Sequence, residues 1–387
     1  GTASNTDVVD LTYCYSAGSA APTCPSTTTA DRSKIQWVKN NLTGAVTAYT
    51  YDKAGRLTKA AITGGTTPAT YTYTYDARGN RLTASGGTGA SQNFTANAAN
   101  QISSANYSYD GTGNLTQDPN GAYAYNAAQQ MTSVTKGGTT YNYTYAGASQ
   151  NEVLSQATPN GTYKVTYGRT DSHGQPIIEQ YKKDTATAYV EHDPVTGEAL
   201  MLRTSSGMQS LYVYDGTGNP AALITSGAYT AFAYDYDPYG VPAITKDSGG
   251  LGTSQNPYAF KAGIQDRVTG WVKYGQRWYN PTDGRWTQQD TLDAPLDPRN
   301  ANRYAYAAND PINNSDPTGR FLKDTPSGCG PYNTPDCVSV TVANYPSDSS
   351  AKGCILSFFW TAISPVLPGV GWVTASSAAV TVVSCVI

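Results

Sequence analysis

Tyrosines alternate with small polar residues along much of the chain, and a short polar turn follows most of these stretches. Four copies show the unit: Tyr49-Thr-Tyr51-Asp-Lys-Ala-Gly55, Tyr73-Thr-Tyr75-Asp-Ala-Arg-Gly79, Tyr107-Ser-Tyr109-Asp-Gly-Thr-Gly113 and Tyr212-Val-Tyr214-Asp-Gly-Thr-Gly218. Because side chains alternate across a strand, both rings of a Tyr-x-Tyr unit lie on one face. Asp and Gly at this spacing favour a tight turn. The pattern therefore predicts repeated strand–turn–strand units.

A single hairpin buries too little surface to be stable, so such units must stack on one another. We therefore expect an all-β fold, with residues 45–320 in one spiralling antiparallel sheet and almost no helix. We also expect the second tyrosine of each unit to occupy an equivalent position in successive hairpins. These tyrosines are Tyr51, Tyr75, Tyr109, Tyr125 and Tyr214.

The repeated units resemble the YD repeats of the RHS and teneurin families, over roughly residues 45–245. The Tyr-Asp-x-x-Gly turn and the following Arg-Leu-Thr, as in Arg56-Leu-Thr58 and Arg81-Leu-Thr83, carry the resemblance. In that family the repeats form a long β-sheet that spirals into a hollow shell. The resemblance thus implies a shell or a rod built from these hairpins.

Residues 236–320 have a different character and resemble the RHS repeat-associated core. The matching motifs are Tyr236-Asp-Pro-Tyr-Gly240, Tyr274-Gly-Gln-Arg-Trp-Tyr279-Asn-Pro-Thr-Asp-Gly284-Arg-Trp286, Asn302-Arg-Tyr-Ala-Tyr306 and Asp316-Pro-Thr-Gly319. In the relatives, which include teneurin shells and the C components of insecticidal toxin complexes, this core closes the shell. We expect an N-terminal cap or plug (1–35), a YD-repeat sheet (36–235), the core (236–320) and a variable apolar C-terminal region (321–387).

Composition excludes several classes of function. Only 14% of residues are charged and the net charge is −3, so no basic field favours nucleic acid. The 31 tyrosines outnumber 6 Phe and 3 Met, and tyrosine suits sheet faces that are half in water. With two histidines and no Cys-x-x-Cys, we expect no metal site and no cofactor. The composition indicates a secreted or cell-surface protein, and the chain begins as if already processed.

The six cysteines fit an oxidising compartment. Six cysteines allow fifteen pairings, and the short loops favour local ones. We predict disulfides Cys14–Cys24, Cys329–Cys337 and Cys354–Cys385.

The resemblance to the RHS core implies self-cleavage of an aspartyl-protease type, just after the final Asp-Pro-x-Gly-x. Carried over by position, the two carboxylates are Asp290 and Asp316. Arg285 matches the core arginine of the family, which could orient one of these carboxylates. The expected cut lies between Arg320 and Phe321. The chain departs from the family pattern at Asp290, which Thr follows instead of Pro, and at Arg320, where Leu is usual. Each Asp could instead simply cap a turn.

The C-terminal region has no charged residue after Lys352 and is strongly apolar. It could be buried against the shell, act on a membrane, or be part of an enzyme domain. The leading interpretation is a toxin-type effector of bacterial competition whose shell encloses or presents this region, with its own C-terminal region and an immunity protein as partners. The first alternative is a structural or adhesive filament subunit that adds its tail to neighbouring subunits. The second alternative is a surface protein that binds cell-surface glycans.

Overall fold

The structure is a computed structural model. It describes residues 7–16, 23–24, 33–87, 91–147, 150–171, 174–225, 228–247, 255–291, 296–297, 299–320, 323–324, 339–343, 354–355 and 384–385. Within these ranges the regular structure is almost all strand, and every strand pair is antiparallel. Two short 3-10 turns, Phe260–Ala262 and Tyr306–Asn309, complete it. The all-β prediction is confirmed.

Two large sheets form a curved wall. The first has the order β28-β1-β2-β3-β4-β5-β6-β7 and the second runs from β21 back to β8. The first sheet comprises β1 (Asp7–Cys14), β2 (Trp37–Asn40), β3 (Val46–Tyr51), β4 (Leu57–Thr63), β5 (Ala69–Tyr75), β6 (Arg81–Ser85), β7 (Gln92–Asn93) and β28 (Ser339–Ala343). The second comprises β8 (Ser108–Tyr109), β9 (Leu115–Asp118), β10 (Gly121–Tyr125), β11 (Met131–Lys136), β12 (Thr139–Gly147), β13 (Gln150–Thr158), β14 (Gly161–Thr170), β15 (Pro176–Lys183), β16 (Ala186–His192), β17 (Ala199–Thr204), β18 (Gln209–Tyr214), β19 (Pro220–Thr225), β20 (Ala228–Tyr236) and β21 (Pro242–Asp247).

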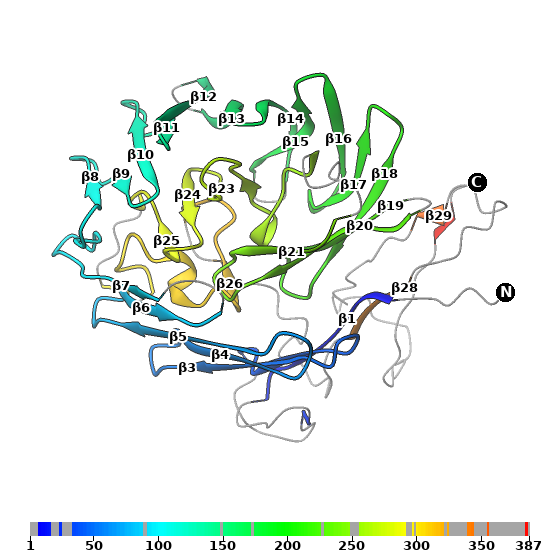
Figure 1. Ribbon diagram of the computed structural model, residues 1–387, viewed down its shortest axis with the longest axis horizontal. Helices are drawn as coiled ribbons and strands as arrows, with labels where there is room; N and C mark the ends of the chain where they lie inside the picture. The colour runs from blue at the N-terminus through cyan, green and yellow to red at the C-terminus, as the bar shows by residue number, and fades with distance from the viewer. Residues whose placement is uncertain are drawn as a thin grey trace, which may run out of the picture.

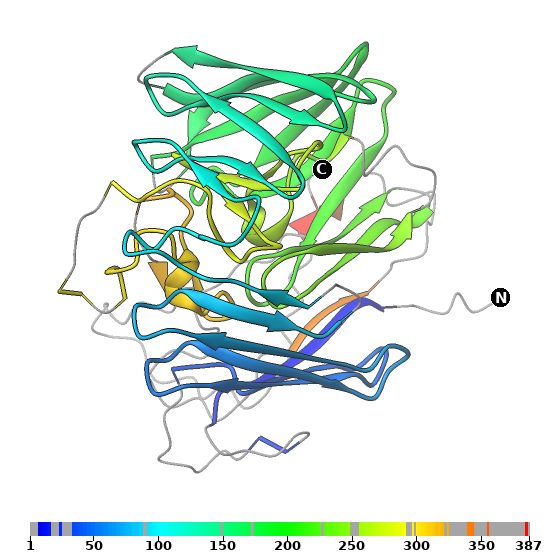
Figure 2. The same cartoon turned by 60° about the vertical axis from the view of Figure 1, so that its left-hand side comes forward.

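Residues 255–291 and 299–320, here called the inner segment, lie inside the curve of this wall. Figure 1 shows them in yellow and orange, surrounded by strands coloured from blue to green, and Figure 2 shows the same arrangement from the side. The inner segment forms β22 (Ile264–Gln265), β23 (Val272–Tyr274), β24 (Arg277–Asn280), β25 (Arg285–Trp286) and β26 (Asn314–Ser315). The resemblance implies a hollow shell. In this protein, however, the inner segment occupies the space inside the two sheets.

The turns of the wall follow from the sequence of each repeat. At Asp215 the carboxylate accepts the backbone N–H groups of Thr217 and Asn219, at 2.8 and 3.0 Å. Gly218 has a φ of 84°, which a residue without Cβ adopts at little cost. Asp52, Asp76 and Asp110 make the same pair of contacts in their own turns. The Asp of each repeat therefore closes its own hairpin.

The two tyrosines of a repeat have different partners. The first packs on the inner segment: Tyr123 against Trp271 at 4.4 Å and Tyr143 against Trp278 at 6.1 Å, measured between ring centres. The second donates its hydroxyl to a backbone carbonyl of the preceding unit. Such bonds join Tyr51 to Ile35, Tyr75 to Leu57, Tyr145 to Met131, Tyr167 to Val153, Tyr214 to Ala199 and Tyr236 to Pro220. One tyrosine thus binds the interior and the other ties neighbouring repeats together.

Two of the tyrosines predicted at equivalent positions depart from this pattern. The buried hydroxyl of Tyr125 makes no such bond to a carbonyl of the described residues, and the hydroxyl of Tyr109 accepts the N–H of Ile102 at 3.3 Å. Tyr109 lies where the expected single sheet is divided in two. Between β7 and β8 the chain makes only an isolated bridge, Ala96 with Ile102. Asn100 and Asn106 adopt positive φ there, which is incompatible with a continuous strand.

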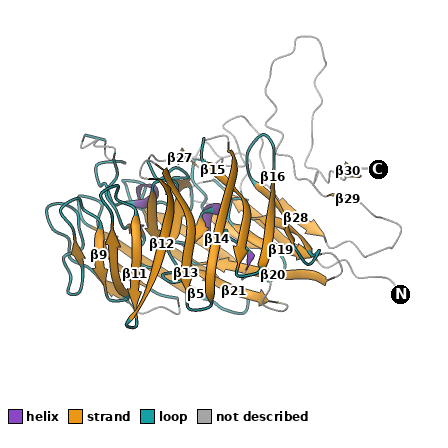
Figure 3. Ribbon diagram, turned by 90° about the horizontal axis from the view of Figure 1, so that it is seen from above, coloured by secondary structure: helices purple, strands orange, loops and turns teal. Residues whose placement is uncertain are grey.

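The wall closes on itself by side-chain packing. Val9 of β1 packs with Val213 of β18 and Ala222 of β19, and Gly216 donates its N–H to the Tyr13 hydroxyl at 2.8 Å. Residues 7–14 were expected in a separate cap or plug, but they form a strand of the sheet, paired with β2. Their alternation of apolar residues, Val9, Leu11 and Tyr13, accounts for this. Figure 3 shows the strands of the wall from above.

Candidate self-cleavage site

Three charged side chains meet where the inner segment ends. Arg277 begins β24, Asp290 follows β25, and Asp316 opens the turn after β26. Arg277 and Asp316 side chains are each 4% exposed, and that of Asp290 is 13% exposed. Arg303 binds the backbone of Asp290 twice. The Arg303 carbonyl accepts the N–H of Asp290 at 2.9 Å, and the Arg303 Nε donates to the carbonyl of Asp290 at 2.8 Å. The fold therefore places two carboxylates, 26 positions apart in sequence, around one guanidinium.

Nη2 of Arg277 contacts both carboxylates. It lies 2.7 Å from Oδ2 of Asp290 and 2.9 Å from Oδ2 of Asp316. The two carboxylate oxygens can be no farther apart than the sum of these distances, 5.6 Å. A single water molecule can span such a gap, since hydrogen bonds are about 3 Å long. The position of the two acids is therefore compatible with shared chemistry.

Arg277 also holds the chain that leads to the expected cut. Its Nε donates to the carbonyl of Gly319 at 2.6 Å, and its guanidinium stacks on the Trp286 ring at 4.0 Å. Burial lowers the pKa of Arg277, while the charges of Asp290 and Asp316 act in the opposite direction. A buried arginine of this kind needs acidic partners, and it has two.

Asp316 also caps the turn before the cut. Its Oδ1 accepts the N–H of Arg320 at 3.1 Å and the hydroxyl of Thr318 at 3.2 Å. Gly319, with a φ of 63°, completes this turn. Phe321, on the far side of the expected cut, lies outside the described residues. The turn brings the Arg320 backbone to the carboxylate pair.

Arg285, expected from the resemblance to orient a carboxylate of this pair, lies elsewhere. Its Nη2 donates to the carbonyl of Asn100 in the wall, and its guanidinium stacks 5.0 Å from the Tyr304 ring. Its backbone pairs with Asn280, at the opposite end of β24 from Arg277, so Arg277 takes the position between the acids. The sequence offered one signal for Arg277, a cation within the aromatic stretch Tyr274-Gly-Gln-Arg-Trp-Tyr279, where a buried charge needs a partner.

A second buried acid pair joins the inner segment to the wall. The Tyr107 hydroxyl donates to Asp283 at 3.2 Å, and the Tyr123 hydroxyl donates to Asp118 at 2.8 Å. Burial, together with the charge of Asp118, raises the pKa of Asp283 to about 6. The folded protein therefore binds this proton more tightly than the unfolded chain does. The resulting stabilisation is complete at pH values below the ordinary pKa of 3.8 and is lost as the pH rises through about 6.

Asp283→Asn should therefore be more stable than the wild type at pH 8, by about 3 kcal/mol at 1.36 kcal/mol per pKa unit. At pH 4 the two proteins should unfold at similar urea concentrations, because the wild-type carboxyl is then protonated. Urea titrations at both pH values measure the difference. Asp297→Asn is the control, since Asp297 is half-buried and the hydrogen bonds from Asn300 and Arg299 lower its pKa. An equal gain in the stability of Asp283→Asn at both pH values would contradict the raised pKa of Asp283.

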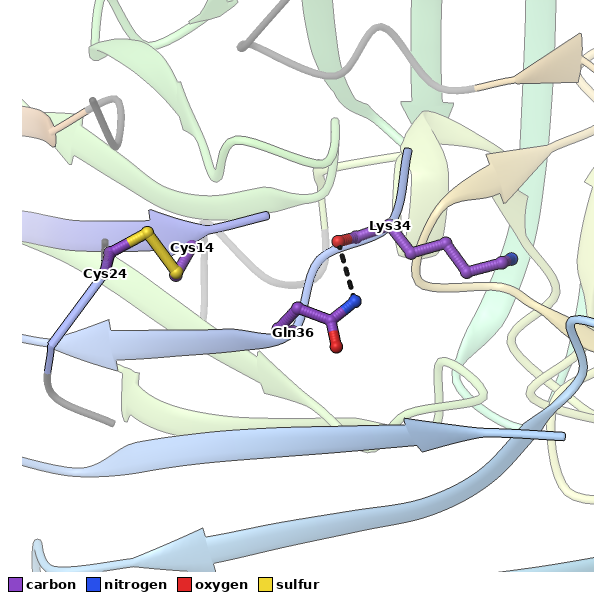
Figure 4. The surroundings of a disulfide bond; sticks show 4 residues. All are labelled: Cys14, Cys24, Lys34 and Gln36. Carbon is purple, nitrogen blue, oxygen red and sulfur yellow. Dashed lines mark hydrogen bonds between the residues drawn. A yellow bond between two sulfur atoms is a disulfide. The ribbon is translucent and has the colours of Figure 1, made fainter. Parts of the chain in front are cut away.

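Of the expected disulfides, the structure contains Cys14–Cys24, with an S–S distance of 2.12 Å. Figure 4 shows it beside β1 and β2, together with the Gln36 side chain, which donates to the carbonyl of Lys34. Cys329 and Cys337 lie outside the described residues. Cys354 of β29 (Cys354–Ile355) is the backbone partner of Cys385 in β30 (Ser384–Cys385). The two C-terminal pairings stay predictions.

Among the described residues, no group of three or more His, Cys, Asp or Glu side chains is placed to hold a metal ion. A helix long and apolar enough to cross a membrane is likewise absent from the described ranges.

Comparison with known proteins agrees with this fold. The family model of the teneurin YD-shell matches residues 30–312. The tRNA3(Ser)-specific nuclease WapA of Bacillus spizizenii is 30% identical over 284 residues, which are 70% of this chain and 12% of that protein. Teneurin-1 of Gallus gallus is 24% identical over 287 residues, 71% of this chain and 10% of that protein.

Two solved structures share the fold. One is a Tc holotoxin pore of Photorhabdus luminescens, with a TM-score of 0.59 and 17% identity over 80% of this chain and 17% of the other. The other is the crystal structure of TcdB2-TccC3-TEV, with a TM-score of 0.58 and 18% identity over 74% of this chain and 16% of the other. This chain thus spans between 10% and 17% of the proteins compared here. The extent of the family match and the repeated Tyr-Asp hairpins show that this chain belongs to the teneurin YD-shell family of RHS/YD-repeat proteins.

Proposed function

We propose that this protein is a secreted RHS-type effector that cuts its own chain between Arg320 and Phe321 and presents residues 321–387 as its cargo. One observation carries the self-cleavage: Asp290 and Asp316 meet on Arg277, which also binds the Gly319 carbonyl beside the bond to be cut. Because the scissile bond belongs to the same chain, the folded structure supplies the proximity that catalysis needs.

Both acids have a role in the reaction. One ionised carboxylate takes a proton from a water molecule, whose oxygen attacks the carbonyl carbon of Arg320. The other carboxyl donates its proton to the carbonyl oxygen. As the C–N bond breaks, the first carboxyl gives its newly gained proton to the departing nitrogen of Phe321, and the second takes a proton back from a hydroxyl of the intermediate as the C=O bond forms again. The reaction requires one proton on the two carboxyl groups, and in that state the cluster with Arg277 has no net charge. Arg277 thus positions both acids near the bond and is itself unchanged by the reaction.

The effector proposal draws on the relatives. The names of several Bacillus relatives describe tRNA nucleases, and one of the solved structures with this fold is a Tc holotoxin pore. The C-terminal region of this chain contains no histidine, so we do not extend nuclease activity to it. Proposed partners are its own C-terminal region, an immunity protein, neighbouring subunits and cell-surface glycans.

Denaturing gels of the purified chain test the proposal. The wild type should run as two polypeptides, whereas Asp290→Asn and Asp316→Asn should run as one, because Asn has the same size but cannot exchange a proton. Asp297→Asn is the matched control, since that half-buried side chain accepts hydrogen bonds from Arg299 and Asn300 of its own turn, and it should be cut like the wild type. Equal cutting in all three variants would rule out the proposed acids.

The filament alternative makes a different prediction for the same sample. An uncut wild-type chain that assembles into ordered fibres would favour a structural subunit that keeps its tail. The pairing of a C-terminal strand with the edge of the wall supports strand addition in general, because an exposed sheet edge accepts a further strand.

A further inference from the structure

The edge strand of the first sheet is covered by a segment from beyond the expected cut. β28 pairs antiparallel with β1, on the side of β1 opposite to β2. The register places Val342 opposite Val9 and Val340 opposite Leu11. In Figure 1 this pair, blue and orange, lies at the end of the wall, away from the inner segment.

β28 pairs with β1 beside a buried apolar contact of the wall. Val9 is 7% exposed and packs with Val213 and Ala222, where the two ends of the wall meet. Directly opposite residues of an antiparallel pair share a face of the sheet. Val340 and Val342 therefore occupy register positions on the same face as Leu11 and Val9. The alternating sequence Ser339-Val-Thr-Val-Ala343 matches this half-buried edge.

Among the described residues, the inner segment occupies the interior of the wall. The inner segment is packed against the tyrosines of the wall, and large side chains such as Tyr279, Trp286, Tyr304 and Tyr306 are almost fully buried there. The second contact beyond the cut is short: β27 (Lys323–Asp324) pairs with β26 through two residues. β28 is the longer attachment, with five residues paired along β1 and a register shift between Asp7 and Val9.

We propose that β1 is an acceptor edge for Ser339–Ala343, and that this strand pairing keeps residues 321–387 on the shell after the backbone has been cut. The inference rests on the proposed self-cleavage for its role, but the attachment itself does not depend on it. Main-chain hydrogen bonds supply the affinity, and the two valines in register with the apolar face of β1 supply the specificity. Release of the cargo then requires this strand to detach.

The test separates attachment from self-cleavage. A recognition site for a sequence-specific protease is inserted after Phe321 in the Asp316→Asn chain, so that the added protease makes the cut. After cutting, size-exclusion chromatography should show the C-terminal fragment eluting with the shell. In a Val340→Pro/Val342→Pro chain most of the fragment should elute separately, because proline removes backbone N–H groups that the ladder can use and does not fit within a strand.

A matched control carries Val380→Pro and Val382→Pro, the same changes elsewhere in the same fragment, and should keep the fragment on the shell. Separation of the unmodified fragment immediately after cutting would overturn the proposal. Retention in the Val340→Pro/Val342→Pro chain would also overturn it, since the fragment would then be held elsewhere. Failure of the proposed self-cleavage would be recognised independently, as a wild-type chain that stays intact without added protease.

Discussion

Replacing Arg277 with methionine is expected to lower the free energy of unfolding by about 3–5 kcal/mol, the usual effect of leaving a buried charge without its partner. The reason is the position of the guanidinium, which is 4% exposed and is the shared partner of Asp290 and Asp316. Methionine fills much of the space beside Trp286 but cannot compensate either carboxylate. Urea unfolding followed by tyrosine and tryptophan fluorescence measures the difference.

Arg203→Met is the matched control. Arg203 pairs with Glu191 on the surface, with side chains 44% and 48% exposed, and losing such a pair costs less than about 1 kcal/mol. Adding Asp290→Asn and Asp316→Asn to Arg277→Met should recover part of the loss, because the buried charges are then gone. Equal unfolding free energies for Arg277→Met and Arg203→Met would contradict the described cluster.

Tyr279→Ala should destabilise the protein by about 3–5 kcal/mol, as expected for emptying a large buried aromatic site. Tyr279 is 0% exposed, its ring stacks on Tyr306 with centres 4.0 Å apart, and its hydroxyl donates to the carbonyl of Tyr239 at 2.6 Å. The loss should appear as cooperative unfolding of the whole shell, because the inner segment supports the wall.

Tyr279→Phe separates the ring from the hydroxyl. It keeps the stacking and removes one hydrogen bond, so its cost should be about 1 kcal/mol, measured in the same urea titrations. If Tyr279→Ala instead left the wall folded, with hydrogen exchange increased only in the inner segment, the two parts would be independent units.

The repeats could be predicted from the sequence because the residues that form each hairpin are close together along the chain. Tyr-x-Tyr places two rings on one face, and the following Asp and Gly close the turn, whatever the rest of the chain does. The division into two sheets depends instead on the positive φ of Asn100 and Asn106, for which the repeat pattern gives no signal. The filling of the interior depends on packing between segments more than a hundred residues apart, such as Tyr143 with Trp278.

The candidate cleavage site, too, could be predicted only in part from the sequence. Asp290 and Asp316 could be named from motifs, and the structure brings both to one nitrogen atom. The motif predicts Arg285 as the arginine of the site, because motif position alone does not show which cation reaches the acids. The hairpin of β24 and β25 directs Arg285 to Asn100 in the wall and leaves Arg277 beside the carboxylates. The partner of a buried charge is thus decided by tertiary structure.

The intact mass of the chain in denaturant tests the central claim, that this site cuts its own backbone, most directly. The wild type is predicted to give two polypeptides, one ending at Arg320 and one beginning at Phe321. The side chain of Arg320 is exposed, and an Arg320→Leu chain should be cut as the wild type is. A single uncut polypeptide from the correctly folded wild type would contradict the account, and Asp290 and Asp316 would then be structural partners of Arg277.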